Sequence, residues 1–498
     1  MNFLDLLKGA EILAQSGNPQ VTGVEYDSRK VKPGDVFVAM KGDSSDGNRF
    51  IEQAIAAGAV AVVTDSNCKP GVAWARVSHG RPALAVVSAN FYQHPAEKLA
   101  VTGITGTNGK STTAFLLESI LRAAGRESAF VGTIEYHVAG KVLSAPHTTP
   151  EALELQRLFR RELEAGGTEV VMEVSSHALA QERTFGIPFD VSIFTNLTRD
   201  HLDYHRSMDE YFSAKRILFS GQGNRGPRVS VINVDDEYGV KLKKFCTGAG
   251  SEVITYGLSG ADFHAAKMEI TPRGTRFQLI TPDDSVAIVS PLIGRVNVYN
   301  ILAACAAAYA RGCPIETIAN GIANLSRVPG RFERVDSGQP FTVVVDYAHT
   351  DDALRNLSSL AREFVNQDGG RVITLFGCGG DRDRSKRPLM GEAAGQGSDF
   401  VVLTSDNPRG EDPLAIINDA AVGLQRSGVN YAVEPDRRSA IQAAIAAAQP
   451  KDIVLLAGKG HERVQIVGNS SIPFDDRQVA TEVLRDLGYD GKGVEKGA

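Results

Sequence analysis

Short apolar runs alternate with amphipathic stretches along most of this chain. Between residues 98 and 328, helical spacing of apolar positions, as in residues 111–124, separates runs that have the character of buried strands. These runs are residues 99–104, 169–175, 190–196 and 228–234. Continuous apolar runs of this length are typical of parallel strands covered on both faces. The pattern therefore predicts an α/β fold with a doubly wound sheet.

The same alternation occurs before and after this stretch and predicts three domains. A chain of 498 residues is too long for one hydrophobic core. The chain pattern breaks near His94 and Pro95, and again at the segment 326–335. Further strand-like runs follow that segment, at residues 342–348, 371–377, 399–405 and 452–458. We expect a small N-terminal α/β domain (1–97), a central domain (98–328) and a C-terminal Rossmann-like domain (329–498).

Residues 101–113, VTGITGTNGKSTT, predict a phosphate-binding loop. The apolar strand candidate breaks into glycines, and then a lysine and hydroxyls open an amphipathic helix, whose amide groups favour anions. The match is to a variant, because Ile104 stands where the common P-loop has glycine. The central domain is thus predicted to be a P-loop domain that binds a nucleoside triphosphate. The expected contacts are Gly106, Thr107, Asn108, Gly109, Lys110, Ser111 and Thr112.

The composition of the chain limits which partners it can bind and in which cellular compartment we expect it. The net charge of −6 and pI of about 6.0, with basic residues spread along the chain, give no footprint for nucleic acid. Five cysteines without paired spacing favour reduced thiols over disulfides or a zinc site. The chain contains no uncharged apolar stretch long enough to span a membrane. We expect a cytoplasmic protein that is a monomer.

Two polar side chains follow strand candidates of the central domain. Glu173 ends a strand expected beside the P-loop strand, where a carboxylate can hold Mg²⁺ that bridges the phosphates. His201 follows the next strand and should lie at the same end of the sheet. The alternatives are an ordinary strand-end carboxylate and a histidine that forms a turn.

Lys215 is expected in a helix of residues 208–219, on the same face as Tyr211, Phe212 and Phe219. Burial lowers the pKa of a lysine, and a neutral amine can react with CO₂ to form a carbamate. That reaction converts a cation into a ligand for a metal ion. The alternative is a lysine whose stem packs on the apolar face while its charged head reaches water.

Polar loops follow the strand candidates of the C-terminal domain. They are residues 346–352, 377–388, 405–413 and 458–462. Ligand chemistry in open parallel sheets gathers at the carboxyl ends of strands, so these loops should face a shared cleft.

The motifs together resemble the Mur ligases of bacterial peptidoglycan assembly. The strings GITGTNGKSTT, MEVSSHALAQER, NLTRDHLDYH with AKRILF, and DYAHTDDAL occur in that family's order, and the resemblance covers all three domains. The string DNPR, residues Asp406, Asn407, Pro408 and Arg409, is similar to the motif of members that add meso-diaminopimelate to UDP-N-acetylmuramoyl-L-alanyl-D-glutamate. Lysine-adding relatives lack the arginine. A guanidinium can grip the second carboxylate of diaminopimelate with two hydrogen bonds.

The resemblance also implies roles for individual residues. ATP would contact the P-loop and Asn297, Arg331, Asp346 and His349, and Mg²⁺ would be bound by Glu173, His201, Ser111 and carbamylated Lys215. The implied catalytic residues are Lys110, His201 and Lys215. The muramoyl dipeptide would meet Thr148, Thr149, Ser175, Gln181 and Arg183, and its uridine Tyr26, Ser28, Asp43, Ser44 and Ser45, in a loop that departs from relatives with His and Gln there. Diaminopimelate would also contact Arg382, Gly458 and Glu462.

The implied chemistry begins with ATP, because a carboxylate does not acylate an amine in water. The D-glutamate side-chain carboxylate would attack the γ-phosphorus, and the amine of diaminopimelate would displace phosphate from the resulting acyl phosphate. His177 and His201 are candidates for the base that deprotonates the amine. Three alternatives stay open: a folylpolyglutamate synthetase, a phosphotransferase that uses the same loop, and a nucleotide-gated binding protein without turnover.

Overall fold

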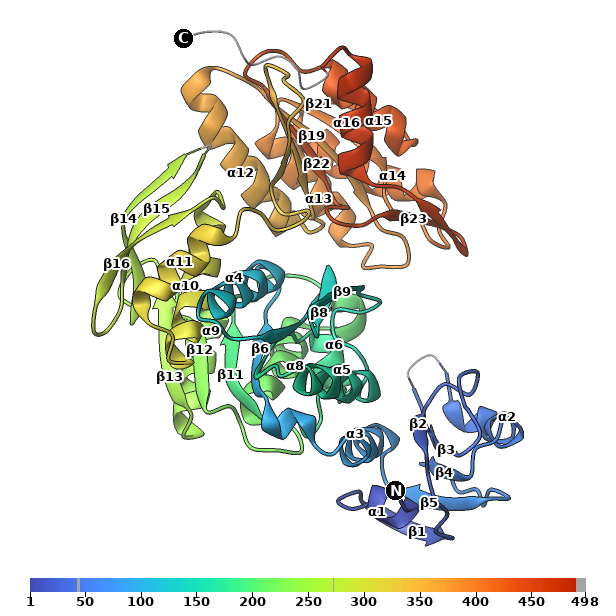
Figure 1. Cartoon of the computed structure of the whole chain (residues 1–498). Coiled ribbons are helices and arrows are strands. Elements are labelled where there is room, and N and C mark those ends of the chain that lie inside the picture. Colours follow the sequence, from blue (N-terminus) through green and yellow to red (C-terminus); the bar gives the residue numbers. More distant parts are fainter. Residues whose placement is uncertain (43–44, 272, 490–498) are drawn as a thin grey trace.

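Three larger sheets and one hairpin organise the computed structural model, which describes residues 1–42, 45–271 and 273–489 (Figure 1). The sheets follow one another along the chain, and each is covered by helices. In Figure 1 the N-terminal sheet stands at the lower right, and the C-terminal sheet lies above the central one.

The N-terminal sheet has the strand order β1-β5-β4-β3-β2, in which β1 alone among these strands is antiparallel to its neighbour. Its strands are β1 (Ile12–Ser16), β2 (Gly23–Glu25), β3 (Asp35–Ala39), β4 (Ala61–Thr64) and β5 (Ala73–Val77). The helical segments beside it are α1 (Phe3–Leu6), η1 (Gly47–Phe50), α2 (Ile51–Ala56), α3 (Gly80–Phe91) and η2 (Pro95–Lys98). Leu153, from the central part of the chain, packs into the core of this sheet and attaches it to the rest of the molecule.

The central sheet has the order β16-β15-β14-β13-β12-β11-β6-β10-β7-β8-β9. Its parallel part comprises β6 (Ala100–Thr105), β7 (Ser128–Val131), β10 (Glu169–Glu173), β11 (Phe189–Phe194), β12 (Val229–Asn233) and β13 (Glu252–Gly257). The P-loop strand β6 lies between β10 and β11, and Ile104 is level with Glu173. The predicted parallel core with its P-loop strand beside the Glu173 strand is therefore confirmed.

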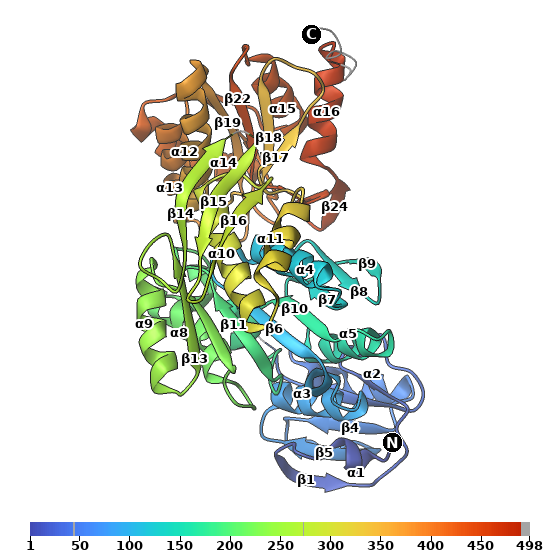
Figure 2. The same cartoon turned by 60° about the vertical axis from the view of Figure 1, so that its left-hand side comes forward.

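Both ends of this sheet are extended by strands that the hydrophobic pattern did not predict. They are β8 (Glu135–Val138) and β9 (Lys141–Ser144) at one end, and β14 (Phe263–Thr271), β15 (Gly274–Ile280) and β16 (Ser285–Ser290) at the other. β14 is parallel to β13 and antiparallel to β15. β9 and β16 are partly exposed to solvent, although residues 286–289 of β16 form a short apolar run. Figure 2 shows β14 to β16 rising from the central sheet alongside the C-terminal domain.

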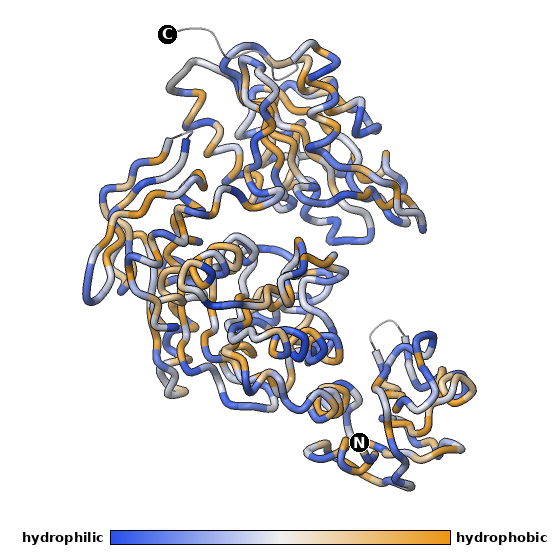
Figure 3. Tube along the Cα trace, viewed as in Figure 1, coloured by the Kyte–Doolittle hydropathy of each residue, from blue (hydrophilic) through white to orange (hydrophobic). Residues whose placement is uncertain are grey.

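Helices cover both faces of the central sheet. They are α4 (Lys110–Ala123), α5 (Ala152–Glu164), α6 (Ser176–Ala180), α7 (Leu202–His205), α8 (Met208–Ser220), α9 (Glu237–Gly248), α10 (Arg295–Ala310) and α11 (Ile315–Asn324). Two apolar clusters result, one around α4 and α10 and the other around α5 and α8. In Figure 3 the hydrophobic colour follows the inner strands, while the outer helices also show hydrophilic stretches.

The C-terminal sheet has the order β17-β18-β22-β19-β20-β21 and is parallel from β18 to β21. Its strands are β17 (Glu333–Val335), β18 (Thr342–Asp346), β19 (Val372–Cys378), β20 (Phe400–Ser405), β21 (Asn430–Val433) and β22 (Ile453–Ala457), with a hairpin of β23 (Val464–Val467) and β24 (Ser470–Pro473). The helices are α12 (Asp351–Asp368), α13 (Lys386–Gly397), α14 (Pro413–Ser427), α15 (Arg437–Ala446) and α16 (Asp476–Asp486). The order of strands brings the four predicted polar loops to one edge.

Candidate functional site

The P-loop turns between β6 and α4 through two glycines in the left-handed region. Gly106 has φ 147° and Gly109 has φ 89°, and a side chain on Gly106 would collide with the hydroxyl of Thr195. Backbone and side-chain atoms of the loop after β11 hold this conformation. Asn108 N donates to Asn196 Oδ1 at 3.0 Å, and Thr107 Oγ1 donates to Thr198 O at 3.1 Å. The first turn of α4 thus presents its amide groups beside a rigid loop.

Two ammonium groups meet at one carbonyl of this loop. Lys110 Nζ donates to Gly106 O at 3.0 Å and to Thr107 O at 2.9 Å, while Lys215 Nζ donates to the same Gly106 O at 2.8 Å. Lys215 is 2 % exposed, as its apolar helix face predicted. Burial, and then the charge of Lys110, hold the pKa of Lys215 well below its usual value.

Glu173 is fully buried at the end of β10 and accepts two hydrogen bonds from one residue. Thr133 N donates to Glu173 Oε1 at 2.8 Å, and the Thr133 hydroxyl donates to Oε2 at 2.9 Å. This carboxylate interacts electrostatically with the Lys110 ammonium. Thr133 therefore orients the acid that the sequence singled out for Mg²⁺.

The residues at this end of the sheet fit a nucleotide-bound Mg²⁺ and do not form a cage for a free metal ion. Across residues 1–42, 45–271 and 273–489, no three His, Cys, Asp or Glu side chains gather as metal ligands. Mg²⁺ at nucleotide sites takes one or two protein ligands and completes its shell with phosphate oxygens and water. Glu173 and the Ser111 hydroxyl can supply such ligands, and Lys215 could do so only as a carbamate.

Aromatic and imidazole rings form a cluster beside Lys215. His177 lies 4.8 Å from His201 and 4.3 Å from Tyr204 between ring centroids, and His205 stacks on Tyr211 at 5.2 Å. Burial lowers the pKa of His177, of His201 and, to about 4, of His205. All three imidazoles are therefore neutral at pH 7, and a neutral imidazole can accept a proton or bind a metal ion.

The carboxylate of Asp200 joins the central and C-terminal domains. Asp200 Oδ1 lies 3.6 Å from Lys386 Nζ, and Asp200 Oδ2 lies 3.4 Å from His201 Nε2 and 3.9 Å from His349 Nε2. Asn108 Nδ2 of the P-loop also donates to Asp352 Oδ2 at 3.0 Å. The two domains thus touch at the nucleotide loop itself.

The residues assigned to the nucleotide's periphery occupy three different environments. Arg331 Nη2 lies 3.4 Å from Ser111 Oγ, at the P-loop. Asp346 accepts hydrogen bonds from Phe332 N at 2.7 Å and Ala348 N at 2.8 Å. It therefore fixes the end of β18 to the segment 326–335 that joins the central and C-terminal domains. Asn297 donates to Ile293 O at 2.7 Å and is 9 % exposed, inside a polar network of α10.

The residues predicted for the muramoyl dipeptide gather between β10 and α5. Thr149 Oγ1 donates to Glu173 O at 2.9 Å and accepts from Ser175 N at 3.1 Å. Arg183 donates to Gln181 Oε1 at 2.7 Å and pairs with Glu151 at 3.0 Å. Thr148 Oγ1 accepts a hydrogen bond from Thr133 at 3.1 Å. The structure therefore brings all five predicted residues together next to the Glu173 strand, and adds Glu151.

The predicted uridine residues are only partly described. Burial, together with the nearby carboxylates of Glu154 and Glu151, raises the pKa of Tyr26. Ser28 Oγ donates to Gln53 Oε1 at 3.3 Å, and Ser45 O accepts from Gly42 N at 2.9 Å. The other two predicted residues, Asp43 and Ser44, lie outside the described residues.

Two arginines that interact electrostatically lie in the loops at the carboxyl ends of β19 and β20. Arg409 Nη1 donates to Gly380 O at 2.8 Å, and Arg382 Nη1 donates to Asp381 O at 2.9 Å. Burial, and then the charge of Arg382, lower the pKa of Arg409. Neither arginine forms an ion pair with a carboxylate of the described residues, and two close cations of this kind suit a carboxylate ligand.

A buried lysine holds the rest of the DNPR motif. Lys459 Nζ is fully buried and lies 3.0 Å from Glu462 Oε2, 3.2 Å from Asn407 Oδ1 and 3.4 Å from Asp406 Oδ1. Asn407 Nδ2 donates to Glu462 Oε2 at 2.8 Å. Gly458, at φ 111°, donates its N–H to Asp346 O at 3.0 Å, and Pro408 O accepts from Glu411 N at 3.0 Å. The two predicted loops therefore form one constellation.

Sequence reasoning missed several of these partners. Lys459 stands between the glycines of GKGHE and Asp200 immediately precedes His201, so adjacency to a motif could have indicated both. Lys386 lies within the predicted loop 377–388 and Glu151 follows Thr149 by two residues, so adjacency could have indicated these two as well. Thr133 carries no such signal, because only folding brings it to Glu173.

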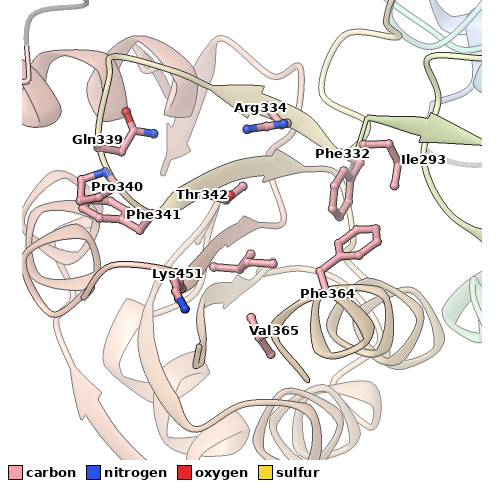
Figure 4. A pocket seen from close by; sticks show the side chains of 11 residues that line it. Ile293, Phe332, Arg334, Gln339, Pro340, Phe341, Thr342, Phe364, Val365 and Lys451 are labelled. Carbon is pink, nitrogen blue, oxygen red and sulfur yellow. The ribbon is translucent and has the colours of Figure 1, made fainter. Parts of the chain in front are cut away.

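The cavity shown in Figure 4 lies at the opposite edge of the C-terminal sheet and does not coincide with these residues. Its volume is about 330 Å³, and the residues that line it include Thr342 and Ile453, the first residues of β18 and β22. The carboxyl ends of the same strands carry the motif loops. Concavity alone therefore does not locate the candidate site.

Comparison with known proteins agrees with this geometry. Three family models match the chain: the Mur ligase family, catalytic domain, at residues 20–102, the Mur ligase middle domain at 104–308, and the Mur ligase, glutamate ligase domain at 330–460. Within residues 1–42, 45–271 and 273–489, no helix is long and apolar enough to cross a membrane.

Individual relatives match over nearly the whole chain. The UDP-N-acetylmuramoyl-L-alanyl-D-glutamate--2,6-diaminopimelate ligases of Solibacter usitatus and Geobacillus thermodenitrificans are 56% and 46% identical, over 98% and 95% of this chain and 99% and 96% of theirs. A solved structure with the same protein name is 34% identical, has a TM-score of 0.68 and covers 98% of this chain and 99% of its own. The chain belongs to the Mur ligase family.

Proposed function

We propose that this protein is the ATP-dependent ligase that joins meso-diaminopimelate to the D-glutamate side-chain carboxylate of UDP-N-acetylmuramoyl-L-alanyl-D-glutamate. The observation that carries the proposal is the position of the Arg382–Arg409 pair, in a domain whose strand-end loops contact the P-loop through Asn108 and Asp352. The names of the full-length relatives support the same reaction. A cytoplasmic location agrees with it, and the monomeric state stays a prediction.

ATP and Mg²⁺ are the proposed cofactors, held by the P-loop residues 106–112 with Glu173. Bound Mg²⁺ would bridge phosphate oxygens and withdraw charge from them. Lys110 lies within reach of the same phosphates, because its ammonium already sits on loop carbonyls and can exchange them for phosphate oxygens. Positioning and charge neutralisation would favour attack of the glutamate carboxylate on phosphorus.

The amino-acid site would bind both charged groups on the distal carbon of diaminopimelate, the carboxylate and the ammonium. Arg409 and Arg382 would bind the distal carboxylate, and Asp406, Asn407 and Glu462 would accept hydrogen bonds from the ammonium beside it. Lys459 neutralises part of that acidic group, so one added ammonium balances the charge. Lysine, which lacks the carboxylate, would leave two guanidinium groups unpaired, and that penalty gives selectivity.

We infer that Lys215 is carbamylated in the active enzyme. Lys215 and Lys110 share the carbonyl of Gly106, so their positive charges oppose each other in a buried place. The lowered pKa favours the neutral form of the Lys215 amine, and a neutral amine adds CO₂. The negatively charged carbamate would attract the Lys110 ammonium, whereas the Lys215 ammonium repels it. The carbamate would also add an oxygen ligand for the metal ion.

The domain bounds 1–97, 98–328 and 329–498 are proposed with separate tasks. The confinement of each large sheet to one of these ranges supports the bounds. Residues 26–45 would meet uridine, residues 148–183 the muramoyl dipeptide, and the C-terminal domain the amino acid. His177 and His201 are both neutral and close to Lys215, which supports either of them as the base that deprotonates the incoming amine.

The decisive experiment measures phosphate release with UDP-muramoyl-dipeptide as acceptor and diaminopimelate, lysine or ornithine in parallel. We expect ADP and phosphate to appear only with acceptor and diaminopimelate together, and at least about a hundredfold lower kcat/KM with lysine. ATP cleavage at the same rate without acceptor would refute the proposal. Glutamate-dependent turnover on a folate would identify the folylpolyglutamate synthetase alternative instead.

A further inference from the structure

A fully buried ion pair lies behind the loops that carry the DNPR and GKGHE motifs. Arg437 opens α15 and Asp476 opens α16, and both side chains are 0 % exposed. The guanidinium binds both carboxylate oxygens, with Nε to Oδ1 at 2.8 Å and Nη2 to Oδ2 at 2.6 Å. The geometry is bidentate, which fixes the plane of the guanidinium.

The remaining N–H groups of Arg437 reach the ends of two strands. Nη2 donates to Ala457 O at 3.1 Å, and Nη1 donates to Ser405 O at 3.4 Å. These are the last residues of β22 and β20, and the next residues are Gly458 and Asp406. Because β19 lies between β20 and β22, no backbone ladder joins the two strands directly. The guanidinium therefore provides a direct link between the starts of the two motif loops.

We propose that Arg437, oriented by Asp476, is a positioning residue for the amino-acid site, which it serves by fixing the spacing of the two motif loops. The inference rests on the proposed function, because it assigns the role to the diaminopimelate half-site. Asp406 and Glu462 approach Lys459 from these two loops, so a change in their spacing alters the ligand geometry without removing any group that touches the ligand. Arg437 contacts the two loops through the backbone carbonyls of Ser405 and Ala457, and its charge also interacts electrostatically with Asp406 and Glu462.

The same two helices offer a matched control. Arg438 and Glu482 form an ion pair of 2.7 Å between α15 and α16, with side chains 50 % and 26 % exposed, and no hydrogen bond links Arg438 to a strand end in the described residues. Paired apolar replacement of a buried ion pair is often neutral for stability. The double variant Arg437→Met with Asp476→Leu is therefore the test, and Arg438→Met with Glu482→Leu is the control.

We expect the test variant to fold and to show a KM for diaminopimelate about tenfold or more above wild type, with the KM for ATP changed less than about twofold. Its preference for diaminopimelate over lysine should fall as well. The control variant should keep both values. A folded test variant with an unchanged KM for diaminopimelate would overturn the proposal.

Two further measurements cover the remaining outcomes. If the double variant does not fold, Arg437→Lys decides, because lysine keeps the charge but lacks the planar guanidinium that binds both oxygens of Asp476. An unchanged KM for diaminopimelate in that variant then overturns the proposal. Amide hydrogen exchange needs no substrate and separates this inference from the proposed function. The backbone amides of residues 405–409 and 457–460 should exchange about tenfold faster in the test variant than in the control. Equal exchange rates would show that Arg437 does not fix the spacing of the two loops. This conclusion holds even if the wild-type enzyme uses an amino acid other than diaminopimelate.

Discussion

At the scale of single residues, Gly106 illustrates how much chemistry one backbone position sets. Its left-handed conformation leaves no room for a side chain, and its carbonyl collects the ammonium groups of Lys110 and Lys215. Burial lowers the pKa of both amines, which favours their uncharged forms and so reduces the repulsion between them. Any positive charge on both amines is repulsive. A phosphate bound at Lys110 and CO₂ added to Lys215 would remove that repulsion.

Lys215 provides the first prediction at this scale. Enzyme equilibrated with ¹³C-labelled bicarbonate should show one carbamate signal in its ¹³C NMR spectrum, and the signal should be missing from Lys215→Gln. Removal of CO₂ should lower kcat by about tenfold or more, and bicarbonate should restore it, because the metal ion loses a ligand. Full activity in CO₂-free buffer would contradict the carbamate.

Arg409 provides the second prediction. Arg409→Ala should lower kcat/KM for diaminopimelate by about 100- to 1,000-fold and should leave the melting temperature within a few degrees, because the side chain supports a ligand more than the fold. Steady-state kinetics with diaminopimelate and lysine would measure the change. The neighbouring exposed Arg384 is the control, and Arg384→Ala should change little. Retained selectivity over lysine in Arg409→Ala would exclude the assigned role.

At the scale of elements, the hairpin of β8 and β9 is attached to the P-loop helix α4 by one imidazole. His137 of β8 lies 2.6 Å from Glu118 of α4 through Nδ1 and 3.0 Å from Glu135 through Nε2, and its ring stacks on Phe130 at 5.0 Å. Burial by itself lowers the pKa of His137, but the two carboxylates outweigh it and the net shift is upward. Arg122 also pairs with Glu118 at 3.1 Å.

A pH dependence follows from this raised pKa. The stabilisation is fully present below the unfolded pKa of about 6.5 and is lost as the pH rises through the folded pKa, because only the protonated ring pairs with both carboxylates. Thermal unfolding between pH 6 and pH 9 should therefore show a loss of stability that His137→Gln abolishes. His264, which contacts a backbone carbonyl instead of a carboxylate, gives the control His264→Gln. Equal slopes in wild type and His137→Gln would disprove the assignment.

At the scale of the whole molecule, the facing carboxyl ends of two parallel sheets define the site. Polar contacts between these ends include Asn108 with Asp352, Arg199 with Ser385 at 2.7 Å, and Asp200 with Lys386, and Ile293 of the central domain packs into the apolar core of the C-terminal domain. Polar contacts at a domain interface break and re-form easily, so the two strand ends can move relative to each other. Closure would exclude water from an acyl phosphate formed between the domains.

A substitution of Lys386 tests whether domain closure excludes water from the acyl phosphate. Lys386→Met removes the cation 3.6 Å from Asp200, so we expect kcat about tenfold lower and more ADP released per amide formed, as water reaches the acyl phosphate. Comparing ADP with amide product measures the coupling. Lys451→Met, at the opposite edge of the same sheet, should keep the two products equal. Full coupling in Lys386→Met would show that this contact does not guard the intermediate.

The sequence by itself determined the parallel strands β6, β10, β11, β12, β18, β19, β20 and β22, the P-loop and the burial of Lys215, because each depends on a local pattern. The parallel strands β7, β13 and β21 were not predicted. Apolar runs mark doubly covered strands, glycines mark the loop, and the spacing around Lys215 places it on an apolar helix face. It also placed the polar loops at one edge, since all parallel strands end on the same side.

Only the tertiary structure decided which partners complete the site. Thr133 on Glu173, Lys386 on Asp200, and Asp476 on Arg437 join residues 40, 186 and 39 positions apart, and no periodic pattern records such pairs. The antiparallel strands within residues 263–290 also escaped prediction, because a strand with one wet face has a weak apolar signal. A local sequence pattern can predict features formed by residues close together in the chain. Contacts between residues far apart in the chain form only when the elements pack, so the sequence pattern does not reveal them.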